Sequence, residues 1–177
     1  MDFVQTEKPI EIKSLSEVLT YQNEDIVYRF MDFFDLDLEA SMDIFEETKK
    51  WLWLRAINKQ RGLNSGKEVT PLFIDGSLLI IDEMWHTFIL YTIEYRNFCQ
   101  ENFGFFIDHT PTSKAAKHDY YKRVELDPEG LKKEQEEKLK YQYSFIYDHL
   151  GEETLVKWYG EFPEKYSLEI IKGLKKG

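Results

Sequence analysis

The stretch "IDEMWHTFILYTIEYRNFC" (residues 81–99) carries large apolar side chains that recur every three or four positions. This spacing is typical of an α-helix, and it continues far enough in both directions to predict one helix over residues 77–103. Apolar side chains occupy nearly every face of that helix, so we expect it to be the central, most buried helix of a bundle. The stretch therefore predicts an all-α fold.

Two further helical patterns precede this stretch. Residues 14–34 have apolar positions at helical spacing, and they form either one helix or, where Asn23 divides them, two short ones. Residues 38–61 form the second pattern, which we expect to stop at Gly62 because glycine adopts the left-handed conformation that ends helices. Residues 1–13, which contain a proline and no helical period, are expected to form an extended amino-terminal arm.

More helices are predicted after the central one. Thr112 or Ser113 can cap a short helix, and Asp127, which is followed by a proline, opens a long helix that ends at Gly151. Two short helices are expected to finish the chain. The prediction is a single helical domain over residues 14–177, an all-α bundle of about six or seven helices around the central helix.

Composition limits the classes of partner. The chain has 177 residues, with 23 basic and 33 acidic side chains, and its net charge of −10 repels the phosphates of nucleic acids. No apolar run approaches the roughly 20 residues that cross a bilayer, so no membrane association is expected. Cys99 is the only cysteine, which excludes an intramolecular disulfide and favours a reducing, cytoplasmic compartment. We expect another protein as partner, and the acidic surface favours a basic one.

A group of polar side chains lies at the head of the predicted central helix. Asp82 and Glu83 precede His86 by four and three positions, so both carboxylates can lie beside one imidazole, with Trp85 next to them. Imidazole and carboxylate groups are ligands that zinc, iron or manganese accept. A di-iron site would need a second Glu-x-x-His pair, and the sequence has none. The pattern predicts a candidate polar cluster, not a two-metal centre.

A single metal ion would need a third ligand, for which His109 in the turn "DHTP" (residues 108–111) is the natural choice, with Asp108 beside it. Zinc and iron are the candidate ions. The obstacle is distance, since a continuous helix places its end about 30 Å from Asp82 at roughly 1.5 Å per residue. The site forms only if the loop returns along the helix. Otherwise Asp82 interacts favourably with the helix start, and His86 hydrogen-bonds to a neighbouring carboxylate.

Several short patterns follow one another in residues 81–111: Asp-x-x-Trp-His, Tyr-x-x-Phe-Cys, Phe-Gly and Asp-His-x-Pro. In this order they resemble the glycine-rich domain-containing protein-like family, and residues 150–166 resemble the tail of its bacterial members. Phe88 and Asp108 stand where the family pattern has histidines, which thins a histidine metal site. The resemblance implies a helical domain, here without the glycine-rich tail, in which the two histidines, Asp82 and Trp85 belong together. It implies no activity.

Two functions remain open from the sequence. The first is a cytosolic, non-enzymatic protein-interaction domain, which the acidic charge, the 16% aromatic content and the lack of a complete catalytic set favour. The second is a metal-binding module or metal-dependent enzyme centred on the cluster of Asp82, Glu83, His86 and His109. The chain has no glycine-rich phosphate loop and no nucleophile elbow, so nucleotide hydrolysis and acyl transfer have no support.

Overall fold

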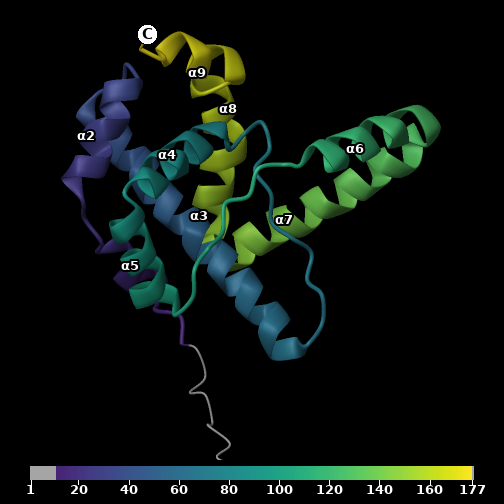
Figure 1. Ribbon diagram of the computed structural model, residues 1–177, viewed down its shortest axis with the longest axis horizontal. Helices are drawn as coiled ribbons and strands as arrows, with labels where there is room; N and C mark the ends of the chain where they lie inside the picture. Colours follow the sequence, from purple (N-terminus) through teal and green to yellow (C-terminus); the bar gives the residue numbers. More distant parts are fainter. Residues whose placement is uncertain (1–10, 177) are drawn as a thin grey trace, which may run out of the picture.

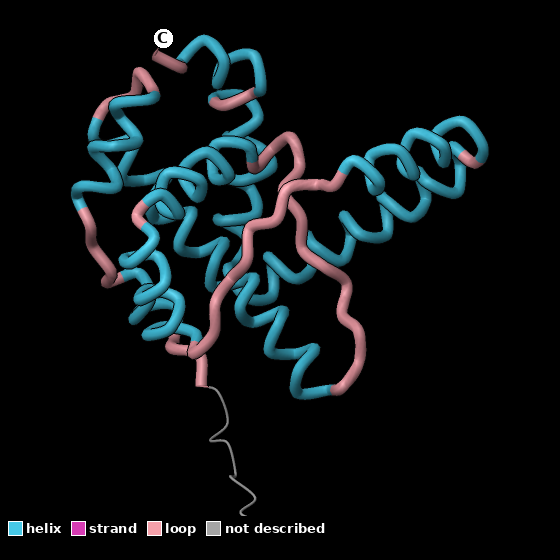
Figure 2. Tube along the Cα trace, viewed as in Figure 1, coloured by secondary structure: helices cyan, strands magenta, loops and turns pink. Residues whose placement is uncertain are grey.

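The computed structural model describes residues 11–176, and these residues form an all-α bundle, which confirms the predicted fold class (Figures 1 and 2). Within this described range no strand element occurs, and one isolated antiparallel bridge joins Phe34 to Lys175. The elements are α1 (Leu15–Leu19), α2 (Glu24–Phe33), α3 (Leu38–Ser65), α4 (Leu79–Leu90), α5 (Thr92–Phe103), α6 (Lys114–Leu126), α7 (Pro128–Val156), the π-helix η1 (Lys157–Glu161), α8 (Phe162–Lys165) and α9 (Leu168–Leu174). None of these helices is both long enough and apolar enough to cross a membrane.

The long helix α3 is the element against which α1, α2, α4 and α7 all pack. Its side chains Trp51, Leu52 and Leu54 are fully buried, as are Trp85 and Phe88 of α4. Large rings dominate the interior, as the aromatic content leads one to expect. Helices α3 and α4 therefore form the buried centre of the bundle together.

The predicted continuous helix over residues 77–103 is wrong, because the chain breaks at Tyr91. The ψ angle of Tyr91 is 68°, its backbone N–H donates to the oxygen of Phe88 at 3.0 Å, and its hydroxyl donates to the oxygen of Asp25 on α2 at 3.0 Å. The apolar side chains before and after the break still pack together. Phe88 and Tyr95 lie edge to face, with ring centroids 5.1 Å apart. Figure 1 shows the change of direction between α4 and α5.

The break determines where the following loop runs. After α5 ends at Gly104, whose φ of 74° is the left-handed conformation that glycine adopts readily, residues 104–113 run back past α4 towards α6 (Figure 2). We call residues 104–113 the strap. Lys59 of α3 donates to the oxygen of Phe106 at 3.1 Å, and Tyr95 donates to the oxygen of Ile107 at 2.7 Å. The strap is thus bound to both α3 and α5.

Helices α6 and α7 form a hairpin that extends away from the other helices (Figure 1). As predicted, Ser113 caps α6 by accepting from the N–H of Ala116 at 3.1 Å, and Asp127 caps α7. No side chain of α6 is buried. The expected stop at Gly151 is confirmed as a break in the helical backbone, with φ 85° and ψ 172°, although helical residues continue directly after it.

The amino-terminal predictions fare differently. Asn23 divides residues 14–34 into α1 and α2 by accepting from the N–H of Ile26, so the two-helix alternative is the correct one. The predicted stop at Gly62 is wrong: α3 continues for about one more turn and ends at Gly66, which has the left-handed φ of 61°. Most of the arm expected over residues 1–13 lies outside the described residues.

Candidate functional site

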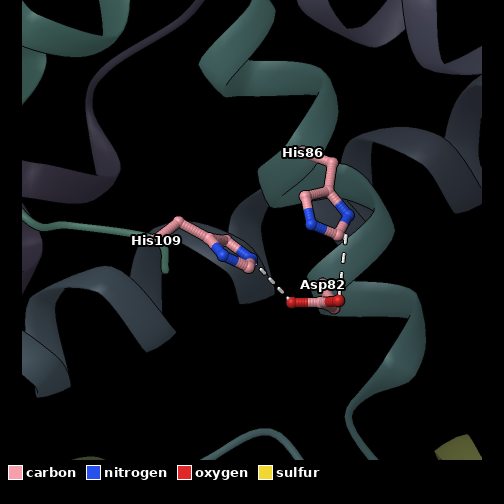
Figure 3. A group of neighbouring side chains, drawn as sticks. All are labelled: Asp82, His86 and His109. Atoms are coloured by element: carbon pink, nitrogen blue, oxygen red, sulfur yellow. Dashed lines mark hydrogen bonds and ion pairs between the residues drawn. The ribbon is translucent and has the colours of Figure 1, made fainter. Parts of the chain in front are cut away.

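The strap brings His109 to the head of α4. Nε2 of His109 lies 2.9 Å from Oδ1 of Asp82, and Nδ1 of His86 lies 3.7 Å from Oδ2 of the same carboxylate (Figure 3). One carboxylate thus lies between two imidazoles, one from its own helix and one from the strap. The distance that separated His109 from Asp82 in a continuous helix disappears because the chain turns at Tyr91 and returns.

Helix geometry explains the α4 half of this cluster. Asp82 and His86 are four residues apart, so their side chains lie on the same face one turn from each other. Asp82 is in the first turn of α4, where the exposed backbone N–H groups favour a negative charge. Glu83 was expected in the cluster, but it points elsewhere and forms an ion pair with Lys175 at 2.8 Å. Only one of the two predicted carboxylates on α4 is therefore available beside the histidines.

Trp85 and Tyr95 hold the strap in place beside α4. The indole Nε1 of Trp85 donates to the hydroxyl of Tyr95 at 2.9 Å, and this hydroxyl donates to the oxygen of Ile107 at 2.7 Å. The ring of Trp85 also packs against that of His109, with centroids 4.2 Å apart. Burial raises the pKa of Tyr95, so the hydroxyl stays protonated and keeps its donor. His109 is therefore positioned by the buried ring of Trp85 on one side and by the attachment of the neighbouring Ile107 to Tyr95.

Sequence reasoning assigned no role to Tyr95 beyond its place in the helix and the family pattern. Tyr95 and Trp85 are ten residues apart and lie on different sides of the break at Tyr91. Helical spacing in the sequence therefore does not indicate that the two side chains meet. Arg55 of α3 was missed entirely. Its guanidinium lies over the ring of Trp85, 4.9 Å from the centroid, and forms a cation–π interaction with it.

The cluster is accessible from one side. The side chains of His109 and Asp82 are 17% and 22% exposed, whereas that of His86 is 53% exposed. The two imidazole rings lie close together, with centroids 4.5 Å apart. His86 therefore forms the outer wall of the cluster, where it can change rotamer without disturbing the core.

One ligand atom from each of Asp82, His86 and His109 lies within 4.8 Å of the others, and residues 11–176 hold no other such group of three. Ligand atoms that share an ion at about 2.0–2.2 Å lie roughly 3–3.5 Å from one another. The 2.9 Å between Nε2 of His109 and Oδ1 of Asp82 lies just below this range, and the 3.7 Å between Nδ1 of His86 and Oδ2 of Asp82 lies just above it. The arrangement can therefore hold a metal ion after a small movement of one side chain.

The other predicted residues lie apart from the cluster. Asp108 is exposed, and it lines a neighbouring pocket with Arg55 instead of facing Asp82. Nδ1 of His149 lies 2.9 Å from the oxygen of Phe145, and the exposed His118 lies on α6. Cys99 is buried, and its burial raises the pKa of the thiol, which agrees with the core position expected from the sequence.

Comparison with known proteins gives one similarity. A family model described as UCP032817-like matches residues 70–133, which include α4, α5, the strap and α6. The matched segment thus contains Asp82, His86 and His109 together. No curated protein and no solved structure matches the chain. The family description names no activity, so the function has to be argued from the cluster itself.

Proposed function

We propose that this protein binds one divalent transition-metal ion through Asp82, His86 and His109. The observation that carries the proposal is the return of the strap, which places His109 2.9 Å from Asp82 although 27 positions separate them. Local helix geometry accounts for Asp82 and His86, but it does not account for the histidine from the strap. This histidine supplies the third donor that a mononuclear site built on Asp82 and His86 needs.

The donor set fits zinc or iron. Two imidazoles and one carboxylate form the ligand set of mononuclear non-haem iron sites and of several catalytic zinc sites. Such a set leaves coordination positions for water or another small ligand, and the exposed side at His86 gives access to them. Trp85 packs against the ring of His109, and Tyr95 fixes the strap beside it by donating to the oxygen of Ile107, so both side chains hold this ligand in place.

The first experiment measures metal content and stabilisation. Protein purified without chelator and protein prepared metal-free are compared by elemental analysis, and the metal-free sample is then melted with added Zn²⁺, Fe²⁺ or Mn²⁺. An ion that binds only the folded state raises the melting temperature in proportion to the logarithm of its concentration above Kd. Less than about a tenth of an equivalent in the native protein, with no shift by any ion, contradicts the proposal.

Single substitutions locate the ion. His109→Ala and Asp82→Asn each break the Asp82–His109 pair, whose atoms lie 2.9 Å apart, and are expected to abolish the metal-dependent rise in melting temperature. His86→Ala leaves that pair intact and is expected only to weaken binding. The matched control is His118→Ala, which removes an exposed histidine on α6. A variant lacking His109 that is still stabilised like the wild type would place the ion elsewhere.

A second candidate function is protein interaction, and the α6–α7 hairpin favours it. Leu126 and Tyr121 on α6 are 83% and 65% exposed, and a cleft of about 950 Å³ lies between the hairpin and the segment before α4. Phe73, Tyr120 and Tyr143 line this cleft. Exposed apolar groups of this kind mark surfaces that other proteins cover. Although the whole chain is acidic, the sequence of α6 has four Lys or Arg residues and two acidic ones.

The interaction candidate has its own test. A partner retained by the wild-type chain is expected to be lost with the double variant Tyr121→Ser/Leu126→Ser. The control Val156→Ser changes a half-exposed apolar residue at the carboxyl end of α7, the end opposite the turn that joins α6 to α7. Equal retention by all three proteins would rule out α6 as the docking surface. A cytoplasmic location stays a prediction that rests on the single, buried cysteine.

A further inference from the structure

A second pocket lies between α3, the segment before α4 and the strap. Its volume is about 310 Å³, and the charged groups in its wall are Arg55, Lys59 and Asp108. The remaining lining consists of Asn58, Val69, Pro71, Leu72 and Ile107. A volume of this size is at the lower end for small-molecule sites, which fits a ligand of few atoms.

Arg55 is the notable side chain in this wall. Among residues 11–176 it donates no hydrogen bond and forms no ion pair. Its guanidinium has a cation–π contact with the ring of Trp85. Burial lowers the pKa of Arg55, because the guanidinium gives up water that no protein acceptor replaces. Five N–H donors in a planar fork thus border the pocket without an acceptor from the protein.

Asp108 is the matching acid. It lines the same pocket, and among the described residues it has neither a hydrogen-bond partner nor an ion pair. Tyr95, Asp108 and Asp82 all act against the fall in the pKa of Arg55, yet no ion pair within 4.0 Å joins Arg55 to Asp108. Two opposite charges therefore face one pocket without neutralising each other directly.

The other polar groups already bind within the protein, Lys59 only in part. Lys59 donates one of its three N–H groups to the oxygen of Phe106 at 3.1 Å and keeps its other donors and its positive charge. The amide of Asn58 donates to the oxygen of Thr70 at 2.9 Å, and its oxygen accepts from the hydroxyl of Tyr141 at 2.7 Å. The groups left for a ligand are thus the guanidinium of Arg55 with the ammonium of Lys59 near it, the carboxylate of Asp108, and the apolar wall that Val69, Pro71 and Leu72 supply.

We propose that this pocket binds a small zwitterion, a free α-amino acid with an apolar side chain. Its carboxylate pairs with Arg55, its ammonium group pairs with Asp108, and its side chain lies on the apolar wall. A simple anion would leave Asp108 unpaired and repelled, and a simple cation would do the same to Arg55. Only a ligand with both charges satisfies the two groups, since charge-assisted hydrogen bonds form at each end.

The pocket is distinct from the metal cluster, but both use the strap. Asp108 faces the pocket while the next residue, His109, faces Asp82, and the ring of Trp85 lies between Arg55 and His109 in the chain of contacts. Binding of the zwitterion needs no metal. Its test is therefore done with chelator present, so that failure of the metal proposal leaves this one standing, and the reverse.

The experiment uses L-leucine and two analogues that each lack one charge. Isothermal titration of the full chain with L-leucine, 4-methylpentanoate and 3-methylbutylamine measures the value of each charged end. L-leucine is expected to bind with a stoichiometry of one, and each analogue is expected to bind at least about tenfold more weakly. Failure of L-leucine to bind saturably, or binding of 4-methylpentanoate with equal affinity, overturns the proposal.

Variants assign the two ends. Asp108→Asn changes an exposed side chain and is expected to remove the preference for L-leucine over 4-methylpentanoate. Arg55→Gln is expected to abolish binding of both. The matched control is Arg61→Gln, since Arg61 lies on the same helix and also over an aromatic ring, that of Phe145 at 5.2 Å. If Arg55→Gln does not fold, the Asp108→Asn result decides alone, and an unchanged preference contradicts the proposal.

Discussion

Nε2 of His109 lies 2.9 Å from Oδ1 of Asp82, and this contact joins the middle of the strap to the first turn of α4. The contact forms because α4 ends at Tyr91, α5 changes the direction of the chain, and the strap then runs back past α4. The same return brings the oxygen of Ile107 to the hydroxyl of Tyr95. The break at Tyr91 and the polar cluster are consequently parts of one arrangement.

Replacing Tyr95 tests the support of the strap. Tyr95→Phe leaves the indole N–H of Trp85 and the oxygen of Ile107 without partners in a buried place. Each unpaired group costs about 1–3 kcal/mol, so we expect the free energy of unfolding, measured in urea, to fall by about 2–6 kcal/mol. Tyr147→Phe, at an exposed position, serves as control and should leave the midpoint nearly unchanged. Equal midpoints for the two variants would show that the hydroxyl of Tyr95 does not hold the strap.

A buried carboxylate joins α3 to the carboxyl-terminal helices. Glu47 accepts from the indole of Trp158 at 2.8 Å and lies 2.9 Å from the ammonium groups of both Lys50 and Lys157. Glu47→Gln removes the charge that these donors share, and we expect a loss of about 2–4 kcal/mol in denaturant unfolding. Glu46→Gln changes the half-exposed neighbour, 3.9 Å from Lys50, and should cost less than about 1 kcal/mol. A loss as large with Glu46→Gln would contradict this account.

The break within α7 depends on glycine. Gly151 has φ 85° and ψ 172°, a conformation that other residues rarely adopt. Gly151→Ala should lower the melting temperature by an amount equivalent to about 1–3 kcal/mol. Gly173→Ala is the control, because Gly173 lies in α9 with open space where a Cβ would be, and this change should be neutral or stabilising. If both alanine variants melt at the wild-type temperature, a side chain does not strain the backbone at position 151, and the account is contradicted.

Local signals explain which parts of the fold could be predicted. Caps at Ser113 and Asp127 and the break at Gly151 follow from residue types with strong local preferences. The break at Tyr91 could not be predicted, since neither glycine nor proline stands there and the apolar period runs on. The contact that Tyr91 makes at the break is a hydrogen bond to the oxygen of Asp25, which is 66 positions away and has no local sequence signal. The choice between Gly62 and Gly66 was likewise open, because both can end a helix.

The candidate site shows the same division between local and long-range information. Asp82 and His86 could be paired from helical spacing, and His109 could be named as a ligand by residue type. The exclusion of Glu83 depends on Lys175, 92 positions further along, and could not be inferred from spacing. The pocket beside Arg55 has no sequence signal either, since its two unpaired charges come from α3 and the strap.

The central claim is that His109 completes a metal site with Asp82 and His86. Titration of the metal-free protein with Co²⁺, followed by the visible absorption of the bound ion, tests it most directly. We predict saturation at one equivalent for the wild type and for the His118→Ala control, and no saturable absorption for His109→Ala. A wild-type chain that shows no saturation, or a His109→Ala variant that binds as tightly as the wild type, would contradict the claim.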